Sequence, residues 1–353
     1  MLSQFNPQMK ILWHLDRINE WLKTGDTTPI TLEVDLSNAC NHNCPWCTFK
    51  YIKNKDILSW PLTKKLLDGA KELNVKGITY TGGGEPFMNP IIYDVLKYTK
   101  SIGLESGIYT NAALLKDVDT IIKNCQWIRI SLDAATEKTY AITHGSKRND
   151  FNIVINNIKE LVKRKKELKS DIVIGVGMLI FYNNYKEIIK FAKLCKNLGV
   201  DYIQYKPVIY SAWEKKQLED KWIKKKIIPR ILKAEQLTDN TFKVVLTQYK
   251  FNDLLTGKQY GRDYKTCYAH YVMGAIGADG KVYICEHLKG FDACVLGDLH
   301  NNTLFEIWNS EQRKKVIKEM NFKRCMALCK NHEVNKMLWH LKNVKKEMHP
   351  NFL

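Results

Sequence analysis

The amino-acid sequence predicts an α/β fold, in which an open, partial (β/α)6 barrel is followed by a small cysteine-rich domain. Three observations predict it. Short β-rich runs alternate with amphipathic helices from about residue 28 to residue 210, the ten cysteines gather in two places, and the texture after residue 262 changes to short β-like runs with several glycines. Strands that alternate regularly with helices indicate parallel βα units.

The six expected strands are Ile30–Leu36, Gly77–Thr81, Gly107–Thr110, Trp127–Leu132, Asp171–Ile180 and Asp201–Pro207. Helical patterns lie between them, as in Phe151–Lys166, where Val154, Ile158 and Leu161 fall on one face. Six units are too few to close an eight-stranded barrel, so we expect an open one. Chemistry in parallel βα folds takes place at the carboxyl ends of the strands.

The chain divides into four expected parts. They are an N-terminal helical extension (1–27), the barrel (28–210), a Lys-rich bridging segment (211–262) and the cysteine domain (263–353), which ends in a helical tail at Asn331–Lys346. In the extension, Ile11–Leu22 has the pattern of a single amphipathic helix.

Composition narrows the class of protein. Of 353 residues, 45% are hydrophobic, which is typical of a folded protein, and the net charge of +18 favours anionic partners. Lysine runs such as Lys163–Lys166 are better explained as solvated helix faces than as a nucleic-acid site, because aromatic residues are not interleaved with them. Neither a signal peptide at Met1–Lys10 nor an apolar run of membrane-spanning length is present, so we expect a soluble, cytoplasmic protein.

Three cysteines form the first cluster. Cys40, Cys44 and Cys47 follow directly on the first expected strand, which places them in the loop at its carboxyl end. Three thiolates can hold one iron–sulfur cubane and leave one iron free for nitrogen and oxygen ligands. A zinc knuckle that includes His42, ordinary core cysteines, or a redox pair of Cys44 and Cys47 are the alternatives. The redox pair leaves Cys40 unexplained, and clustering by chance is rare at this composition.

The pattern Cys-x3-Cys-x2-Cys, with Trp46 before the last cysteine, resembles the radical S-adenosylmethionine (SAM) superfamily. The resemblance implies that Cys40, Cys44 and Cys47 hold a [4Fe–4S] cluster whose fourth iron binds the amino and carboxylate groups of SAM, with Trp46 beside the cofactor. It also implies that an external donor such as flavodoxin or ferredoxin supplies an electron, and that SAM is cleaved to a 5′-deoxyadenosyl radical that abstracts hydrogen from the substrate.

A glycine-rich turn, Thr81-Gly-Gly-Gly-Glu-Pro86, follows the second expected strand. Glycine lets polar groups of a ligand approach the main chain directly. The turn resembles the Gly-Gly-Glu-Pro element of the same superfamily, which implies contact with the SAM amino group through Gly83, Gly84, Glu85 and Pro86.

Later strand ends carry further candidates. Asn111, Ser131 and Asp133 resemble positions near the carboxylate and ribose of SAM, although Asn111 and Asp133 fit a helix cap or a turn equally well. Gly175 and Gly177 in the fifth strand fit either room for adenine or a bulge. Lys206, at the end of the sixth strand, is not assigned a role, since lysines are usually exposed.

The second cysteine cluster contains Cys267, Cys285, Cys325 and Cys329, with Cys294 between them. Four thiolates fully ligate a cubane, and a four-cysteine zinc site is the alternative. The arrangement resembles the SPASM/twitch extension of radical SAM enzymes and implies one auxiliary [4Fe–4S] cluster, with Cys294 spare or an alternative ligand. Two isolated residues, Cys125 and Cys195, are expected in the core.

Oxidation of a substrate also needs a base, for which Asp279, Glu286 and His287 are candidates. About 27 residues precede the first strand, whereas peptide-modifying members of the superfamily begin with a domain that grips a leader peptide. We therefore expect an anionic small-molecule substrate (a sugar, aminocyclitol or nucleotide conjugate) that undergoes dehydrogenation, epimerisation or a related step. A peptide or protein side-chain modifier is the alternative, and a basic, zinc-stabilised nucleic-acid-binding protein is the second alternative. No membrane partner is expected.

Overall fold

The structure is a computed structural model that describes residues 7–209, 218–256, 262, 264–320 and 325–344. Residues 1–6 of the expected extension, the expected boundaries at 210/211 and at 263, and the end of the expected tail helix at Lys346 lie outside the described residues. Among the described helices, none combines the length and the apolar character that crossing a membrane requires.

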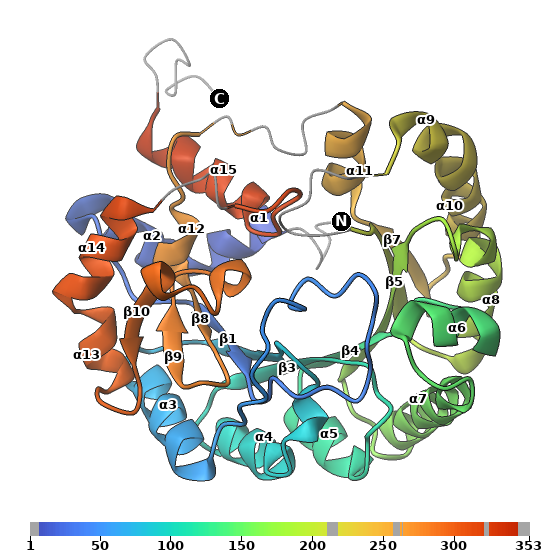
Figure 1. Cartoon of the computed structure of the whole chain (residues 1–353), viewed down its shortest axis with the longest axis horizontal. Helices are drawn as coiled ribbons and strands as arrows, with labels where there is room; N and C mark the ends of the chain where they lie inside the picture. The colour runs from blue at the N-terminus through green and yellow to red at the C-terminus, as the bar shows by residue number, and fades with distance from the viewer. Residues whose placement is uncertain (1–6, 210–217, 257–261, 263, 321–324, 345–353) are drawn as a thin grey trace.

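A curved parallel sheet forms the centre of the molecule (Figure 1). Its six barrel strands are β1 (Thr31–Asp35), β2 (Gly77–Thr81), β3 (Glu105–Thr110), β4 (Trp127–Ser131), β5 (Val173–Ile180) and β6 (Tyr202–Pro207). Each of them pairs in parallel with the next. All six strands expected from the sequence are confirmed, with ends that differ by at most two residues.

Helices cover the outer face of these strands (Figure 1). They are α3 (Trp60–Glu72), α4 (Ile92–Ser101), α5 (Val118–Asn124), α6 (Glu137–His144), α7 (Asn149–Glu167) and α8 (Ile188–Leu198), with short 3-10 turns at η2 (Pro86–Met88) and η3 (Tyr185–Glu187). Strand β2 shows how the two faces separate: Ile78 and Tyr80 are buried, and the Tyr80 hydroxyl lies 2.5 Å from Oγ1 of Thr99 on α4. The alternate residues of each strand face the inside of the barrel.

The remaining described strands extend both edges of the same sheet. They are β7 (Lys243–Leu246), parallel to β6, β8 (Met273–Ile276), parallel to β1, and the antiparallel β9 (Lys281–Tyr283) and β10 (Val295–Asp298). The strand order is β10-β9-β8-β1-β2-β3-β4-β5-β6-β7, so the described strands leave the barrel open between β7 and β10. The cysteine-rich segment therefore continues the barrel sheet, which the sequence did not predict.

Short helices accompany these outer strands. They are α9 (Asp220–Trp222), the π-helical turn η4 (Ile223–Ile227), α10 (Ile228–Glu235), α11 (Gln248–Leu255), α12 (Ala269–Val272), the 3-10 turns η5 (Glu286–Leu288) and η6 (Asp292–Cys294), α13 (Leu304–Trp308), α14 (Glu311–Glu319) and α15 (His332–Lys342).

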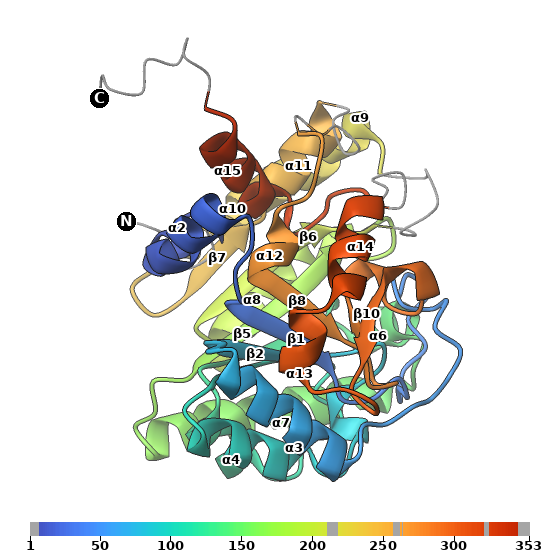
Figure 2. The same cartoon turned by 90° about the vertical axis from the view of Figure 1, so that its left-hand side faces the viewer.

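The N-terminal extension packs against the C-terminal part of the chain (Figure 2). The single helix expected at Ile11–Leu22 is interrupted: α1 (Pro7–Lys10) runs into the 3-10 turn η1 (Ile11–His14), and α2 (Leu15–Thr24) starts anew because His14 has φ −130° and ψ 43°. Trp21 on α2 is fully buried, with its ring 4.9 Å from that of Tyr268. The two ends of the chain therefore share a second, smaller core.

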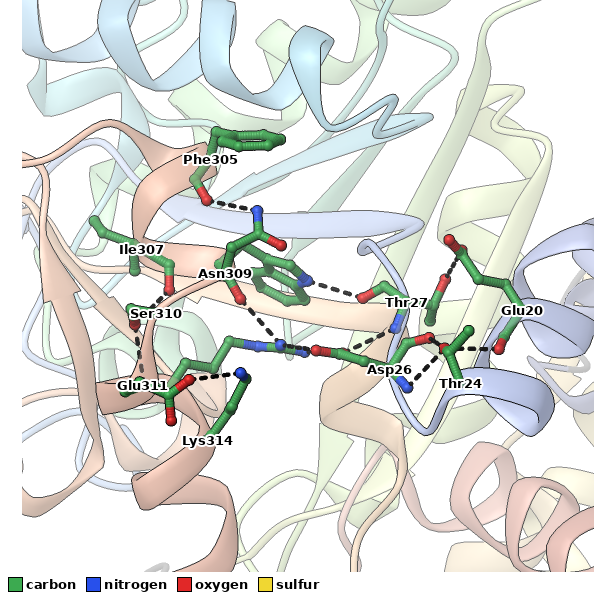
Figure 3. Close-up of polar contacts among 12 residues, drawn as sticks. Glu20, Thr24, Asp26, Thr27, Phe305, Ile307, Asn309, Ser310, Glu311 and Lys314 are labelled. Atoms are coloured by element: carbon green, nitrogen blue, oxygen red, sulfur yellow. Dashed lines mark hydrogen bonds and ion pairs between the residues drawn. The ribbon is translucent and has the colours of Figure 1, made fainter.

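A polar network ties the segment after α2 to α13 and α14 (Figure 3). Arg313, which is only 1% exposed, donates from Nη1 and Nη2 to the two carboxylate oxygens of Asp26 at 2.7 and 2.8 Å. The indole Nε1 of Trp308 donates to the carbonyl oxygen of Thr27 at 2.9 Å, and the Arg313 guanidinium lies 4.3 Å from the Trp308 ring. The planar guanidinium of Arg313 can bond to the Asp26 carboxylate and lie over the Trp308 ring at the same time.

Replacing Arg313 with lysine is expected to destabilise the protein by about 1.5–3 kcal/mol, because lysine cannot form the two-pronged bond to Asp26. The midpoint of urea unfolding measures this change, provided that the slope of the transition is unaltered. Lys314→Ala is the matched control, since Lys314 forms an exposed pair with Glu311 and its loss should cost less than about 0.5 kcal/mol. Equal effects of the two variants would contradict the role given to Arg313.

Candidate active site

The loop that carries the first three cysteines stands at the carboxyl end of β1 and is closed at its neck. Ser37 and Ile57 form an isolated antiparallel bridge. The buried Asn89 donates from Nδ2 to the carbonyl oxygens of Leu36, at 3.0 Å, and Leu58, at 2.9 Å. One side chain thus holds both ends of the loop, a role that no local sequence signal indicated.

The three thiols differ in their surroundings. Cys40 and Cys47 are exposed, whereas Cys44 is half-buried with its Sγ 3.6 Å from Nδ1 of His144, the last residue of α6. Burial lowers the pKa of His144 to about 3, so its ring is neutral, and the ring stacks on that of Tyr140 at 4.2 Å. His144 was missed in the sequence, because it lies one hundred residues from Cys44.

The three thiols differ from a single-ion site in what they require. Within the described part of the chain, no group of three or more His, Cys, Asp or Glu side chains is close enough to hold one metal ion. A cubane instead binds each thiolate at a separate iron. Burial raises the pKa of Cys40 to about 11. A nearby cationic metal is what such a thiol needs to ionise.

The glycine-rich turn packs directly on the cysteine loop. A Cβ atom on Gly84 would lie 2.1 Å from the carbonyl oxygen of Ala39, and one on Gly83 would lie 2.3 Å from Oδ1 of Asn38. The N–H groups of Gly83 and Gly84 donate inward, to Oδ2 of Asp35 and to the carbonyl oxygen of Ser37.

The carbonyl groups of the same turn suit an ammonium ligand. Those of Gly82, Gly83 and Gly84 accept no hydrogen bond from the described residues. They therefore remain available as acceptors, and an ammonium group such as that of SAM is a donor only.

Glu85 and Pro86 belong to the scaffold around this turn. Pro86 begins η2, and the Glu85 carboxylate accepts hydrogen bonds from the N–H of Asn111 at 2.8 Å and the hydroxyl of Thr110 at 2.6 Å. Burial raises the pKa of Glu85 to about 7. The Glu85 N–H donates to the Ala39 carbonyl oxygen. Glu85 thus joins the end of β3 to the cysteine loop.

Asn111 and Asp133 also make structural bonds at the strand ends. Asn111 donates from Nδ2 to Oδ1 of Asn41 on the cysteine loop, and its Oδ1 accepts the N–H of Ala113 in a turn. Asp133, with φ +52°, accepts the N–H of Leu179 on β5 at 2.6 Å. Asn111 and Asp133 thus make contacts of the kind that the sequence analysis gave as the alternative to SAM binding.

Ser131 and Trp46 occupy the same end of the barrel. Ser131 is the last residue of β4 and stands opposite Gly177 of β5. Trp46 is buried, with its ring 4.0 Å from that of Phe181, just beyond β5. The indole of Trp46 thus packs the cysteine loop against the segment that follows β5.

The second set of cysteines comes together from three segments. Cys267 precedes α12, Cys285 follows β9, and Cys325 and Cys329 precede α15. Burial raises the pKa of all four thiols, and the charge of Cys329 further raises the pKa of both Cys267 and Cys285. Cys329 therefore lies near enough to Cys267 and Cys285 for their charges to interact. Cys294 is buried and lies close enough to raise the pKa of Cys325.

The three candidate bases occupy different settings. Asp279 lies in the turn between β8 and β9, where its carboxylate accepts the Lys281 N–H and the Tyr283 hydroxyl. Glu286 is buried, with Oε2 3.4 Å from the Cys285 thiol and Oε1 3.2 Å from Nε2 of His287. Glu286 is thus the candidate that adjoins the second set of cysteines.

Comparison with known proteins defines the class. A family model for the radical SAM superfamily matches residues 34–201, and one for an iron–sulfur cluster-binding domain, SPASM, matches residues 267–331. The chain therefore carries a radical SAM domain, typical of enzymes whose cofactors are SAM and [4Fe–4S] clusters, and a C-terminal iron–sulfur cluster-binding domain.

Curated relatives match about half of the chain. A tungsten-containing aldehyde ferredoxin oxidoreductase cofactor-modifying protein of Pyrococcus furiosus is 28% identical over 178 residues, which are 48% of this chain and 49% of that protein. An S-adenosylmethionine-dependent nucleotide dehydratase of a Fibrobacter species is 23% identical over 168 residues, 45% of this chain and 50% of that protein. The chain spans about half the length of the curated relatives it matches.

Solved structures match over most of the chain. SuiB of Streptococcus suis bound to S-adenosylmethionine has a TM-score of 0.66 at 15% identity, covering 92% of this chain and 78% of that one. The protein anSMEcpe with bound AdoMet has a TM-score of 0.61 at 17% identity, covering 87% of this chain and 88% of that one. At these identities the likeness establishes the fold alone.

Proposed function

We propose that this protein is a radical SAM enzyme that abstracts hydrogen from a small molecule, in a dehydrogenation, epimerisation or related step. One observation carries the proposal: the loop with Cys40, Cys44 and Cys47 is packed against the glycine-rich turn at the carboxyl end of the barrel. A cluster on that loop and a ligand on that turn would therefore be neighbours.

Each part of the site has a proposed task. Cys40, Cys44 and Cys47 hold one [4Fe–4S] cluster, and the carbonyl groups beside Gly83 and Gly84 accept the SAM ammonium. The auxiliary cluster is held by Cys267, Cys285, Cys325 and Cys329. When bound, these groups supply a 5′-deoxyadenosyl radical and a second iron–sulfur site for an electron or the substrate. Ser131, Asn111 and Asp133 shape the edge where the carboxylate and ribose of SAM would lie.

The proton that leaves the substrate needs an acceptor, and we assign that task to Glu286 rather than Asp279. Glu286 adjoins the proposed auxiliary site through the Cys285 thiol, whereas Asp279 lies in the turn between β8 and β9 and bonds to Lys281 and Tyr283. An electron donor such as flavodoxin or ferredoxin completes the system. A cytoplasmic location is consistent with ten free cysteines.

A small-molecule substrate is favoured over a peptide by the curated relatives. Their names refer to a nucleotide dehydratase, a GTP 3′,8-cyclase and a cofactor-modifying protein. Support for a peptide substrate comes from SuiB, which has been solved with its precursor peptide but resembles this chain in fold only.

The test is the metal content of anaerobically reconstituted protein, together with SAM cleavage under reduction. We expect about eight iron per chain, falling to about four when Cys40, Cys44 and Cys47 are all replaced by alanine. Formation of 5′-deoxyadenosine should disappear in that variant.

The matched control is Cys125→Ala, because Cys125 is a buried cysteine outside both sets and its loss should leave about eight iron. Zinc with negligible iron in the wild-type protein would contradict the proposal and favour the zinc-stabilised nucleic-acid-binding protein.

A further inference from the structure

A cavity of about 430 Å³ lies inside the barrel, and its described lining is cationic. The charged residues of that lining are Lys10, Arg129, Lys206, Lys250 and Lys330, without a carboxylate among them. Aromatic rings complete the wall, from Tyr109, Trp127, Tyr202 and Tyr249. Small-molecule sites are of this size and combine apolar walls with a few convergent polar groups.

Arg129 reaches into the cavity across β5. Its Nη1 donates to Oε1 of Gln204 on β6 at 2.7 Å, and its guanidinium lies 4.0 Å from the ring centre of Tyr109. Gly177 of β5 lies beside this crossing, where a Cβ would make an ordinary contact of 3.8 Å with Nε of Arg129. Nε and Nη2 of Arg129 have no hydrogen-bond acceptor among the described residues, so part of the arginine fork remains available.

Lys206 and Lys250 approach the cavity from β6 and from α11, the helix that follows β7 (Figure 1). Lys250 is only 9% exposed. Within the described part of the chain neither lysine has a carboxylate in ion-pair range, whereas Lys330 pairs with Glu33 and, at 3.5 Å, with Glu286. Burial lowers the pKa of Lys250 to about 8 and lowers that of Lys206 well below its ordinary value.

Cations held in a poorly hydrated cavity without a counter-ion are costly for the folded protein. Binding sites commonly carry such a cost because a ligand later compensates it. We propose that Arg129, Lys206 and Lys250 bind the phosphate group of a small-molecule substrate inside the barrel. This inference rests on the proposed function, whose substrate class it specifies.

The position of these cations suits a substrate that reaches both proposed cofactor sites. Arg129 lies two residues before Ser131 on β4, and Lys206 is the residue before the last of β6. Lys330, also in the lining, directly follows Cys329. The cavity thus adjoins the carboxyl ends of two barrel strands and the second set of cysteines.

Phosphate fits this site better than a carboxylate does. Arginine combined with lysine supplies a planar fork and two point charges, the set that proteins use for phosphate oxygens. A phosphate or diphosphate carries two or more negative charges, which offsets more of the cationic lining than one carboxylate can. The rings of Tyr109 and Trp127 offer apolar surface to the rest of the molecule.

The experiment titrates reconstituted holoenzyme with inorganic pyrophosphate at saturating SAM and constant ionic strength. We expect Lys206→Met and Lys250→Met each to raise the dissociation constant by about 10-fold or more, the ordinary effect of losing one charged hydrogen bond. Lys163→Met removes the same charge from a lysine side chain that is 63% exposed on α7, and should change binding less than about 2-fold. Acetate in place of pyrophosphate should bind negligibly.

A second measurement separates binding from folding. Without ligand, Lys250→Met should melt at the same temperature as wild type or higher, because a buried, unpaired charge is replaced by an apolar chain of similar length. A lower melting temperature would assign the lysine to the fold and overturn the inference. So would equal weakening by Lys163→Met, displacement of pyrophosphate by SAM, or stronger binding of acetate. Wild-type protein that cleaves SAM yet fails these tests would refute the phosphate site alone, and absence of SAM cleavage would refute the proposed function.

Discussion

Replacing Gly84 with alanine is expected to reduce reductive SAM cleavage by about 100-fold or more. The added Cβ would lie 2.1 Å from the carbonyl oxygen of Ala39 and 2.6 Å from its carbonyl carbon. These are main-chain atoms of the cysteine loop, so no side chain can swing away to make room. The loop must shift, and Cys40, the next residue, shifts with it.

The measurement is 5′-deoxyadenosine formation by the reconstituted variant, with iron content as a check that the C-terminal cysteines remain loaded. Gly77→Ala is the matched control, at the start of the strand that leads into this turn, since its Cβ would meet Glu105 only at 3.9 Å, an ordinary contact. Wild-type turnover by the Gly84 variant would show that the loop and the turn do not need this close approach.

Local patterns were enough to predict the barrel. In β2, alternation places Ile78 and Tyr80 on the helix side, and in α7 the residues Val154, Ile158 and Leu161 are all buried as their spacing indicated. Periodicity gives the face of an element and the type of element, because both depend on neighbours a few residues away.

Pairing between distant segments was not predictable in the same way. Strand β8 lies beside β1, yet the paired residues Met273 and Thr31 are separated by most of the chain, and four residues of β8 carry no signal for a particular partner. The same holds for Trp21, which is buried against residues near the C-terminal end of the described chain.

The sequence predicted one part of the candidate site, the cysteines, but not the other, the lysines of the cavity. Cysteine spacing identified both sets of thiols, because a cluster needs a rare residue type at short intervals. The lysines of the cavity gave no such signal. Lys206 and Lys250 are two among 55 basic residues, most of which are expected on the surface, and only the three-dimensional arrangement separates them from exposed lysines such as Lys163.

Lys289→Met is expected to destabilise the protein by about 3–5 kcal/mol, because it leaves the carboxylate of Asp35 buried without its cation. Lys289 is 1% exposed and Asp35 is 0% exposed, and the ammonium of Lys289 bonds to Oδ2 of Asp35. Burial raises the pKa of Asp35, and the Lys289 charge opposes that shift. The midpoint of urea unfolding measures the loss.

This pair also links two parts of the proposed active site. The same Oδ2 of Asp35 accepts the N–H of Gly83 in the glycine-rich turn, while Lys289 belongs to the segment between η5 and η6, which follows Cys285. Replacing both partners, as in Asp35→Leu with Lys289→Met, should cost less than Lys289→Met alone, because no charge is left unpaired. Lys64→Met, which breaks an exposed pair with Asp68, should cost less than about 1 kcal/mol. If Lys289→Met cost no more than Lys64→Met, the two parts would not be joined through this buried pair.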